Sequence, residues 1–287
     1  MNRRALIASI LALTLGPAAG HAADTADDMS KTMDRMAQEH QHDKPAATAA
    51  AMTAPAQEVT GQDVVYATVA GKPVKGFLAK PKNAKGPLPG IIVIQEWWGL
   101  NDNIRQMAKR LAGEGYVTLA VDLYGGQVAE TPDKAQELMK AVLANTSEGA
   151  DNVRQAYAYL ETKEKAPKIG VIGWCFGGGW SLQTALLLPD KIDATVIYYG
   201  HLEMDKAKLG LLKMPILGFF GGKDQGIPVA SVQEFEKALK DLGKSVEIHI
   251  YPDASHAFAN PSGGAYNEAA AKDSWQRTVA FFAKNLK

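Results

Sequence analysis

Cys175 is the only cysteine in the 287-residue chain, and it lies in the glycine-rich stretch Gly173-Trp174-Cys175-Phe176-Gly177. Glycine stands two residues before and two residues after it, which is the spacing of the G-x-S-x-G turn that exposes a nucleophile between a strand and a helix. Side chains at the two flanking positions would collide inside so tight a turn. A helix beginning after the cysteine would stabilise its thiolate. We therefore predict that Cys175 is a catalytic nucleophile; the alternative is a buried, inert cysteine beside a glycine-rich phosphate-type loop.

Two further residues have the types and the order that a nucleophilic cysteine needs. Asp224 follows the predicted strand 214–220, and His256 follows the predicted strand 246–251. In hydrolases with this turn, the nucleophile, the acid and the histidine follow one another along the chain in that order. Open α/β sheets also collect catalytic groups at the carboxyl ends of their strands. We predict that His256 is the general base and acid and that Asp224 orients its ring.

The other five histidines are weaker candidates. His21 falls in a predicted signal peptide, and His40 and His42 fall in a predicted linker. His201 follows a strand without an acid placed by the same logic, and His249 alternates within a strand. We expect none of them to act in catalysis.

The elements that must position these residues follow from hydrophobic periodicity. We predict a hairpin and then buried strands, at 64–70, 74–80, 89–95, 116–123, 169–173, 194–199, 214–220 and 246–251. Helical patterns lie between them, at 101–113, 132–143, 147–162, 180–188, 229–243 and 265–286, the first capped by Asn101. Strands that alternate with helices predict an α/β fold of three layers with a largely parallel central sheet.

The chain begins with a segment that differs from this pattern. Residues 1–22 have a basic start, a short apolar run and small residues, which predicts a secretory signal peptide; a membrane anchor is the alternative. Residues 23–58 contain almost no large aliphatic side chains, so we predict a flexible linker. The predicted domain is 59–287, and the predicted location is periplasmic or secreted.

The linker contains a cluster of potential soft-metal ligands: Met29, Met33, Met36, His40 and His42. Thioether and imidazole suit Cu(I), so metal handling by this segment is an alternative function. The competing interpretation is an incidental polar tether without fixed ligand geometry.

Formal charge is balanced at 31 basic and 31 acidic residues, which gives no electrostatic footprint for nucleic acid or an anionic membrane. No segment after the signal is long and apolar enough to span a bilayer. We expect no nucleic-acid partner and no cofactor, and the oligomeric state stays open.

The domain resembles the dienelactone hydrolase family over essentially all of 60–287. The segments that carry the resemblance are "IIVIQEWWGLN" (91–101), "AVDLYGG" (120–126), "IGVIGWCFGGG" (169–179), "GGKDQGIP" (221–228) and "YPDASHAFAN" (251–260). Cysteine at the turn is the feature that best separates this family from other α/β-hydrolases, most of which have serine there. The resemblance implies an α/β-hydrolase fold and hydrolysis of an ester or lactone.

The resemblance also implies roles for the residues after the first long buried strand. Glu96 corresponds to a glutamate that regulates ionisation of the cysteine, by disfavouring the thiolate until substrate arrives. The backbone N–H groups of Phe176 and Trp97 would form the oxyanion hole, the first from the geometry of the turn and the second from the resemblance.

The sequence departs from the family pattern where the namesake enzymes bind the carboxylate of their lactone. No arginine occurs between His256 and Lys272, and the predicted helix 132–143 has lysines such as Lys134 but no arginine. A lysine offers a point charge and not a bidentate fork. Aromatic residues are expected at the pocket mouth and predict an apolar or aromatic acyl or alcohol group; the pocket residues we expect are Trp98, Tyr124, Trp174 and Lys134.

The function predicted from the sequence is an exported hydrolase that cleaves a carboxylic ester or lactone through a Cys-His-Asp triad and an acyl-thioester. The alternatives are metal handling by the linker on a hydrolase scaffold and a thiol redox sensor. A redox sensor is the weaker alternative, because the chain has no second cysteine that could resolve a sulfenic acid on Cys175. The natural substrate is not specified.

Overall fold

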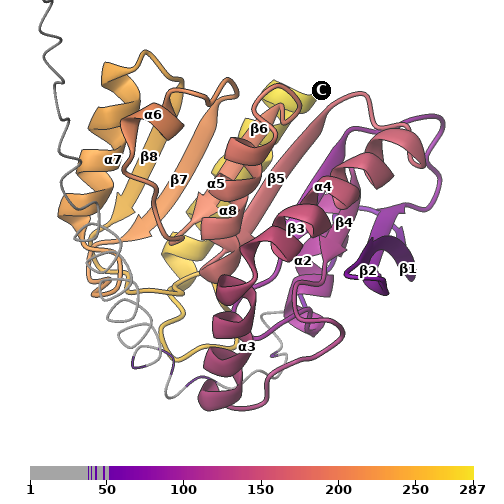
Figure 1. The fold of residues 1–287 in the computed structure, drawn as a ribbon, viewed down its shortest axis with the longest axis horizontal. Helices are drawn as coiled ribbons and strands as arrows, with labels where there is room; N and C mark the ends of the chain where they lie inside the picture. The colour runs from indigo at the N-terminus through magenta and orange to yellow at the C-terminus, as the bar shows by residue number, and fades with distance from the viewer. Residues whose placement is uncertain (1–37, 39, 41–42, 44–47, 49–51) are drawn as a thin grey trace, which may run out of the picture.

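Eight strands form one sheet in the order β1-β2-β4-β3-β5-β6-β7-β8 (Figure 1). The computed structural model describes residues 38, 40, 43, 48 and 52–287. The strands are β1 (Val59–Val69), β2 (Lys72–Pro81), β3 (Gly90–Ile94), β4 (Val117–Val121), β5 (Ile169–Trp174), β6 (Ala194–Tyr198), β7 (Ile216–Gly221) and β8 (Val246–Tyr251). Strands β3 to β8 pair in parallel, while β2 is antiparallel to both β1 and β4. This confirms the predicted opening hairpin and the largely parallel sheet.

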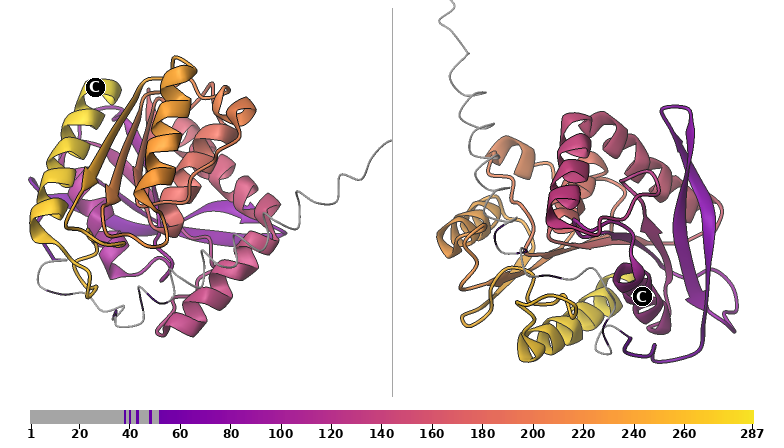
Figure 2. Two further views of the ribbon diagram at one scale, coloured as in Figure 1. Left: turned by 90° about the vertical axis from the view of Figure 1, so that its left-hand side faces the viewer. Right: turned by 90° about the horizontal axis from the view of Figure 1, so that it is seen from below.

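Helices cover both faces of the sheet. They are α2 (Asp102–Gly113), α3 (Pro132–Ala144), α4 (Thr146–Thr162), α5 (Phe176–Leu187), α6 (Lys206–Leu209), α7 (Val229–Asp241) and α8 (Glu268–Leu286). In two perpendicular views α2 and α8 lie on one face, and α4, α5 and α7 lie on the other (Figure 2). As predicted, the side chain of Asn101 caps α2 by accepting from the N–H of Ile104 at 3.2 Å. The architecture is the predicted three-layer α/β fold.

Helix α5 begins four residues earlier than the sequence predicted, at Phe176 instead of Trp180. Its first turn contains Gly177, Gly178 and Gly179, which are poor helix formers, so local propensity predicts a loop. The close approach of this turn to the neighbouring backbone explains the difference. A Cβ on Gly178 would lie 2.4 Å from the carbonyl oxygen of Tyr198, so only glycine lets the helix begin against β6.

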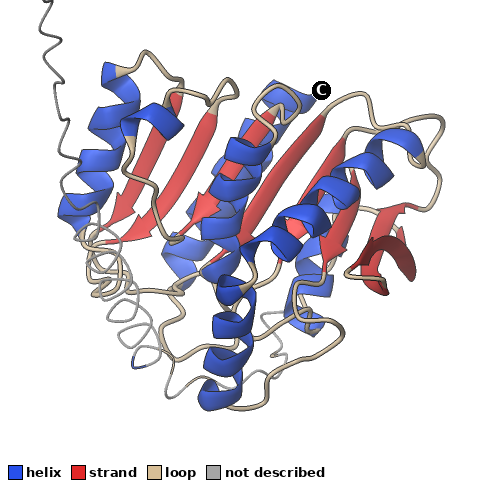
Figure 3. Ribbon diagram, in the orientation of Figure 1, coloured by secondary structure: helices blue, strands red, loops and turns tan. Residues whose placement is uncertain are grey.

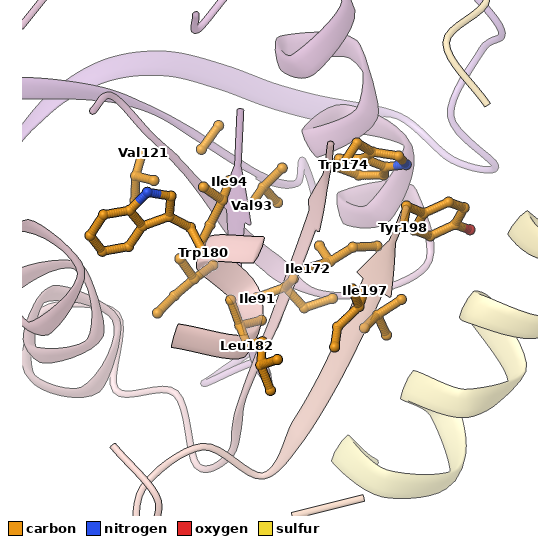
Figure 4. Packing of buried hydrophobic residues seen from close by; sticks show 14 of the residues in the cluster. Ile91, Val93, Ile94, Val121, Ile172, Trp174, Trp180, Leu182, Ile197 and Tyr198 are labelled. Atoms are coloured by element: carbon orange, nitrogen blue, oxygen red, sulfur yellow. The ribbon is translucent and has the colours of Figure 1, made fainter. Parts of the chain in front are cut away.

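The core lies between the sheet and its two helix layers. Every residue of β3, β4, β5, β6 and β7 is buried, which agrees with the continuous apolar runs of the sequence. Figure 4 shows side chains of β3, β5 and β6 packed with Trp180 and Leu182 of α5. Trp174 and Tyr198 lie together, away from Trp180, and the Tyr198 hydroxyl is 2.7 Å from Thr278 on α8.

The parallel strands all end at one edge of the sheet, where their arrowheads meet in Figure 3. The segments that follow these ends carry Glu96 after β3, Cys175 after β5, Asp224 after β7 and His256 after β8. The fold therefore gathers the predicted chemistry from four strands that are separate in sequence. Among the residues that the structure describes, no helix is both long and apolar enough to cross a bilayer.

The predicted signal peptide lies outside the described residues, and so does much of the predicted linker. Where the linker is described, it contacts the domain. Gln57 donates through Nε2 to the carbonyl oxygen of Gly113 at 2.8 Å, and the Thr53 carbonyl accepts from Gln106 Nε2 at 2.8 Å. His40 is 1 % exposed. At these positions the predicted linker contacts the domain, through backbone polar groups and one imidazole whose partners composition does not reveal.

Candidate active site

Cys175 occupies a strained turn between β5 and α5, with φ 55° and ψ −118°. A Cβ on Gly173 would lie 2.1 Å from the carbonyl oxygen of Gly177. A Cβ on Gly177 would lie 2.4 Å from the carbonyl oxygen of Gln95. Both distances are impossible for a real side chain, so the two glycines are a steric condition of the turn, as the spacing predicted. The turn places the sulfur at the N-terminus of α5.

His256 and Asp224 meet beside this turn. His256 Nδ1 lies 2.8 Å from Asp224 Oδ2, and both side chains are completely buried. The other carboxylate oxygen of Asp224 accepts from the N–H groups of Gly226 and Ile227 at 2.9 and 2.8 Å. These bonds fix the carboxylate, which in turn fixes the imidazole with Nε2 as its free nitrogen. The arrangement is compatible with the predicted Cys-His-Asp triad.

A third group that the sequence did not predict also contacts the nucleophile. His40 Nε2 lies 3.7 Å from the Cys175 sulfur, and His40 Nδ1 lies 2.6 Å from Asp43 Oδ2. The His40 ring lies 4.6 Å from the Trp97 ring and 5.3 Å from the His256 ring, between centroids. The sulfur is thus next to two imidazoles, each bonded through Nδ1 to a buried carboxylate.

The electrostatics of the site favour a thiolate. Burial alone would raise the pKa of Cys175, but His256 and His40 outweigh it and lower this pKa to about 6. Burial would lower the pKa of His256, yet Asp224 and Cys175 raise it well above its usual value. At neutral pH the geometry therefore favours a thiolate paired with imidazolium.

Glu96 lies in the same buried environment, 4 % exposed, and the Tyr199 hydroxyl donates to its Oε1 at 3.5 Å. Burial, and next the negative charge of Cys175, raise the pKa of Glu96 to about 8. A carboxyl that is protonated at neutral pH does not repel a thiolate. The expectation that Glu96 keeps the resting thiol neutral therefore does not fit these charges, because two imidazoles flank the sulfur and the acid is uncharged. Control of the thiol by Glu96 stays a prediction.

The backbone N–H groups predicted for the oxyanion hole belong to Phe176, the first residue of α5, and Trp97, which follows β3. In the described part of the chain, no group accepts a hydrogen bond from either amide. Such a site requires amides without an acceptor in the protein, and the oxyanion role of these two stays a prediction.

A cavity of about 640 Å³ reaches the nucleophile between α3, α4, α5 and the segment around α6. Most of its lining surface is apolar, although about half of the lining residues are polar. The lining residues are Met139, Leu143, Thr146, Ser147, Ala150, Arg154, Cys175, Phe176, Gly179, Trp180, Gln183, Leu187, His201, Glu203 and Lys208. A cavity of this kind is typical of a small-molecule site.

None of the four predicted pocket residues lines this cavity, so their part in a substrate pocket stays a prediction. Trp174 points away from α5 and packs on Tyr198, because alternate residues of a strand face opposite sides of the sheet. Trp98 packs against Trp97, and Tyr124 lies behind Phe176, with ring centroids 5.1 and 5.7 Å apart. Lys134 instead pairs with Glu137 on the surface of α3 at 2.8 Å.

Sequence reasoning missed three residues of the site: His40, Asp43 and Arg154. His40 and Asp43 are three residues apart, a spacing that allows a local imidazole–carboxylate bond. Arg154 lies on α4, the helix that follows the one at 132–143 where a cationic contact was expected. The first pair had a usable signal in the sequence, whereas the cavity position of Arg154 depends on how α4 packs.

His40, Cys175 and His256 are also the one cluster of metal-binding residue types among the described residues, with candidate ligand atoms within 4.8 Å of one another. A thiolate and two imidazoles suit Zn²⁺ or Cu⁺. A metal ion there would occupy the nucleophile and its base, so it would compete with nucleophilic catalysis. Of the predicted linker ligands, Met29, Met33, Met36 and His42 lie outside the described residues.

Residues 74–286 match the sequence model of the dienelactone hydrolase family. The chain is 36 % identical to Protein usf of Aquifex pyrophilus over 223 residues, covering 75 % of this chain and 95 % of that protein. It is 32 % identical over 251 residues to a provisionally named carboxymethylenebutenolidase of Saccharolobus solfataricus, with the same coverages. The crystal structure of a provisionally named dienelactone hydrolase from Klebsiella pneumoniae superposes with a TM-score of 0.72 at 30 % identity, covering 79 % of this chain and all of that one.

Proposed function

Because this chain belongs to the dienelactone hydrolase family, whose members act on lactones or esters, we propose that it works through an acyl-thioester on Cys175. The observation that carries the proposal is the pairing of Cys175, at the end of a cavity, with a carboxylate-bound imidazole. Cys175 is the only thiol in the chain, so a trapped acyl-thioester could form at this residue alone.

In the proposed reaction the Cys175 thiolate attacks the carbonyl carbon of the substrate. The developing oxyanion accepts hydrogen bonds from the N–H groups of Phe176 and Trp97, each worth about 3 kcal/mol in such sites. The intermediate collapses, the C–O bond of the ester breaks, and His256 gives its proton to the leaving oxygen. Water then gives a proton to His256, attacks the thioester carbonyl and releases the acid, and the electron pair of the C–S bond returns to sulfur.

Trapping the acyl-enzyme tests this mechanism. Mixing the protein with an activated aryl ester should add one acyl group to the intact mass, and Cys175→Ala should show no adduct. Circular dichroism controls for the fold of the variant. Unchanged ester hydrolysis by Cys175→Ala would refute the assignment of the nucleophile.

We further propose that the substrate has an apolar body and can carry an anionic group toward the mouth of the cavity. Apolar side chains such as Met139, Leu143 and Trp180 line most of the cavity, and Arg154 is an exposed cation on its wall. No described residue forms an ion pair with Arg154, whereas Lys208 is paired with Glu203 at 2.7 Å. Arg154 could thus do what the arginines of the namesake enzymes do.

Replacing Arg154 with alanine should raise KM for a carboxylated aryl ester about two- to fivefold, the effect of losing one exposed ion pair. KM for the neutral analogue should not change. Arg277→Ala, which removes an arginine from the surface of α8, is the matched control. Equal effects on the charged and neutral esters would exclude anion recognition by Arg154.

We propose export on the pattern of residues 1–22 alone. Its measurable consequence is a mature protein that begins at Ala23, which N-terminal sequencing of the expressed protein detects, and an intact Met1 would contradict it. Metal handling by the linker gains less support, because His40, one of its five proposed ligands, is bonded to Asp43 and packed at the nucleophile.

A further inference from the structure

The described residues that precede β1, here called the N-terminal segment, contact the loop that follows β8 and the active site. Thr48 donates through its hydroxyl to the carbonyl oxygen of Pro261 at 2.8 Å. Asp43 Oδ1 accepts from the N–H of Gly264 at 2.9 Å, across 221 residues of sequence. Together with the contacts of Thr53 and Gln57 to α2, these bonds hold the described residues of the segment against the domain.

His40 and Asp43 repeat the chemistry of His256 and Asp224. In both pairs a buried carboxylate holds Nδ1, at 2.6 Å for His40 and 2.8 Å for His256. The two rings lie 86° apart in orientation. Because Asp43 occupies Nδ1 of His40, the other ring nitrogen, Nε2, is the one that faces Cys175. Its single described partner is the Cys175 sulfur at 3.7 Å.

Burying an imidazole and a carboxylate is costly unless each has partners, and here every polar atom of the pair has one. Burial would lower the pKa of His40, but its bonds to Asp43 and Cys175 raise it to about 9. The charges that face the sulfur are thus two imidazoliums, His40 and His256, with their carboxylates Asp43 and Asp224. Tyr124, Tyr199 and Glu96 also face the sulfur and are neutral, because burial raises the pKa of each.

His40 does not line the cavity that ends at the nucleophile. The cavity that ends at Cys175 and Phe176 is lined by α3, α4, α5 and the segment around α6, and His40 is not among its lining residues. His40 instead contacts Trp97 and His256.

We propose that His40, oriented by Asp43, is a second catalytic imidazole that the N-terminal segment supplies to the Cys175 sulfur. The assignment rests on the function proposed above. Before acylation the Nε2–H of His40 donates to the thiolate and keeps it deprotonated. During deacylation the C–S bond breaks, and the same N–H stabilises the sulfur that recovers the electron pair. His256 carries the protons in both steps.

The test measures alkylation of Cys175 by iodoacetamide as a function of pH, in the full chain. His40→Ala should move the midpoint of the alkylation profile upward by about one pH unit, which makes alkylation about tenfold slower on the acidic limb. Asp43→Asn should move it in the same direction but less, since an amide cannot charge-pair with the ring. His249→Ala is the matched control, because this histidine pairs with Glu247 on β8, away from the site. A midpoint unchanged in both His40→Ala and Asp43→Asn would overturn the proposal.

Ester hydrolysis by the same variants gives the second readout. His40→Ala should lower both kcat and kcat/KM, because the proposal has His40 assist deacylation and also keep the thiolate deprotonated before acylation. A variant that is faster than the unmodified chain would show that the segment blocks the site, which would also overturn the proposal. Alkylation needs no substrate, so it tests the contact between His40 and the sulfur independently of ester hydrolysis. If His40→Ala shifts the alkylation profile but the unmodified chain forms no acyl-enzyme, the proposed hydrolysis is refuted and the contact is not. If His40→Ala fails to fold, Asp43→Asn decides the outcome.

Discussion

Replacing Asp224 with asparagine should lower kcat by about 10⁴-fold while the protein stays folded. Asp224 Oδ1 already holds the N–H groups of Gly226 and Ile227. The amide oxygen of asparagine would take that place, and its NH₂ group would face His256 Nδ1. The ring would then have to accept at Nδ1 and carry its proton on Nε2, so it could no longer act as a base toward the substrate or water.

Steady-state kinetics with an activated ester, together with the thermal unfolding midpoint, measure this effect. Asp253→Asn provides the control, because Asp253 is an exposed residue on the neighbouring loop that pairs only with Lys223 among the described residues. It should have normal activity. If Asp224→Asn retained more than about a tenth of the activity, Asp224 would not be the acid that orients His256.

Replacing Gly177 with alanine should destabilise the protein by more than about 4 kcal/mol, or prevent folding. This exceeds the roughly 1–3 kcal/mol that overfilling a core usually costs, because the new Cβ would overlap fixed backbone atoms. The new Cβ would lie 2.4 Å from the carbonyl oxygen of Gln95 and 2.5 Å from that of Ile94. Both oxygens belong to backbone at the end of β3, which cannot move without disturbing the central sheet.

Gly179→Ala is a control two positions along the same helix. Its Cβ would lie 3.3 Å from the nearest atom, the backbone nitrogen of His201, so only a small adjustment is needed. Alanine also favours a helix over glycine by up to about 1 kcal/mol. Urea unfolding should therefore show a near-neutral change for Gly179→Ala. Similar stabilities of the two variants would mean that the turn does not need glycine at position 177.

The sequence was sufficient for those parts of the site that depend on local pattern and strand order. Continuous apolar runs identify the buried strands, and the order Cys175, Asp224, His256 then follows from placing each residue after a strand. The cavity was less predictable. Trp174 is adjacent to the nucleophile in sequence, yet it packs on Tyr198, on the side of the sheet that α8 covers. Trp174 is the last residue of β5, and successive side chains of a strand face opposite sides of the sheet.

His40 and Asp43 could not be placed from composition, although a spacing of three residues allows the local bond that they form. The sequence around them contains few large apolar side chains, a composition that ordinarily favours disorder. Its described residues are held by polar partners such as the N–H of Gly264 and the carbonyl oxygen of Pro261. Those groups are presented by a loop whose shape depends on the complete fold, so no window of sequence contains the information.

The bond between Asp43 and Gly264 has a consequence for the timing of activity. Synthesis proceeds from the N-terminus, so the segment with His40 leaves the ribosome long before the loop that receives it. Until β8 and that loop are made, Cys175 has neither imidazole beside it, and a nascent chain carries a cysteine of ordinary acidity. The lowered pKa of Cys175 is therefore expected only once the complete polypeptide has folded.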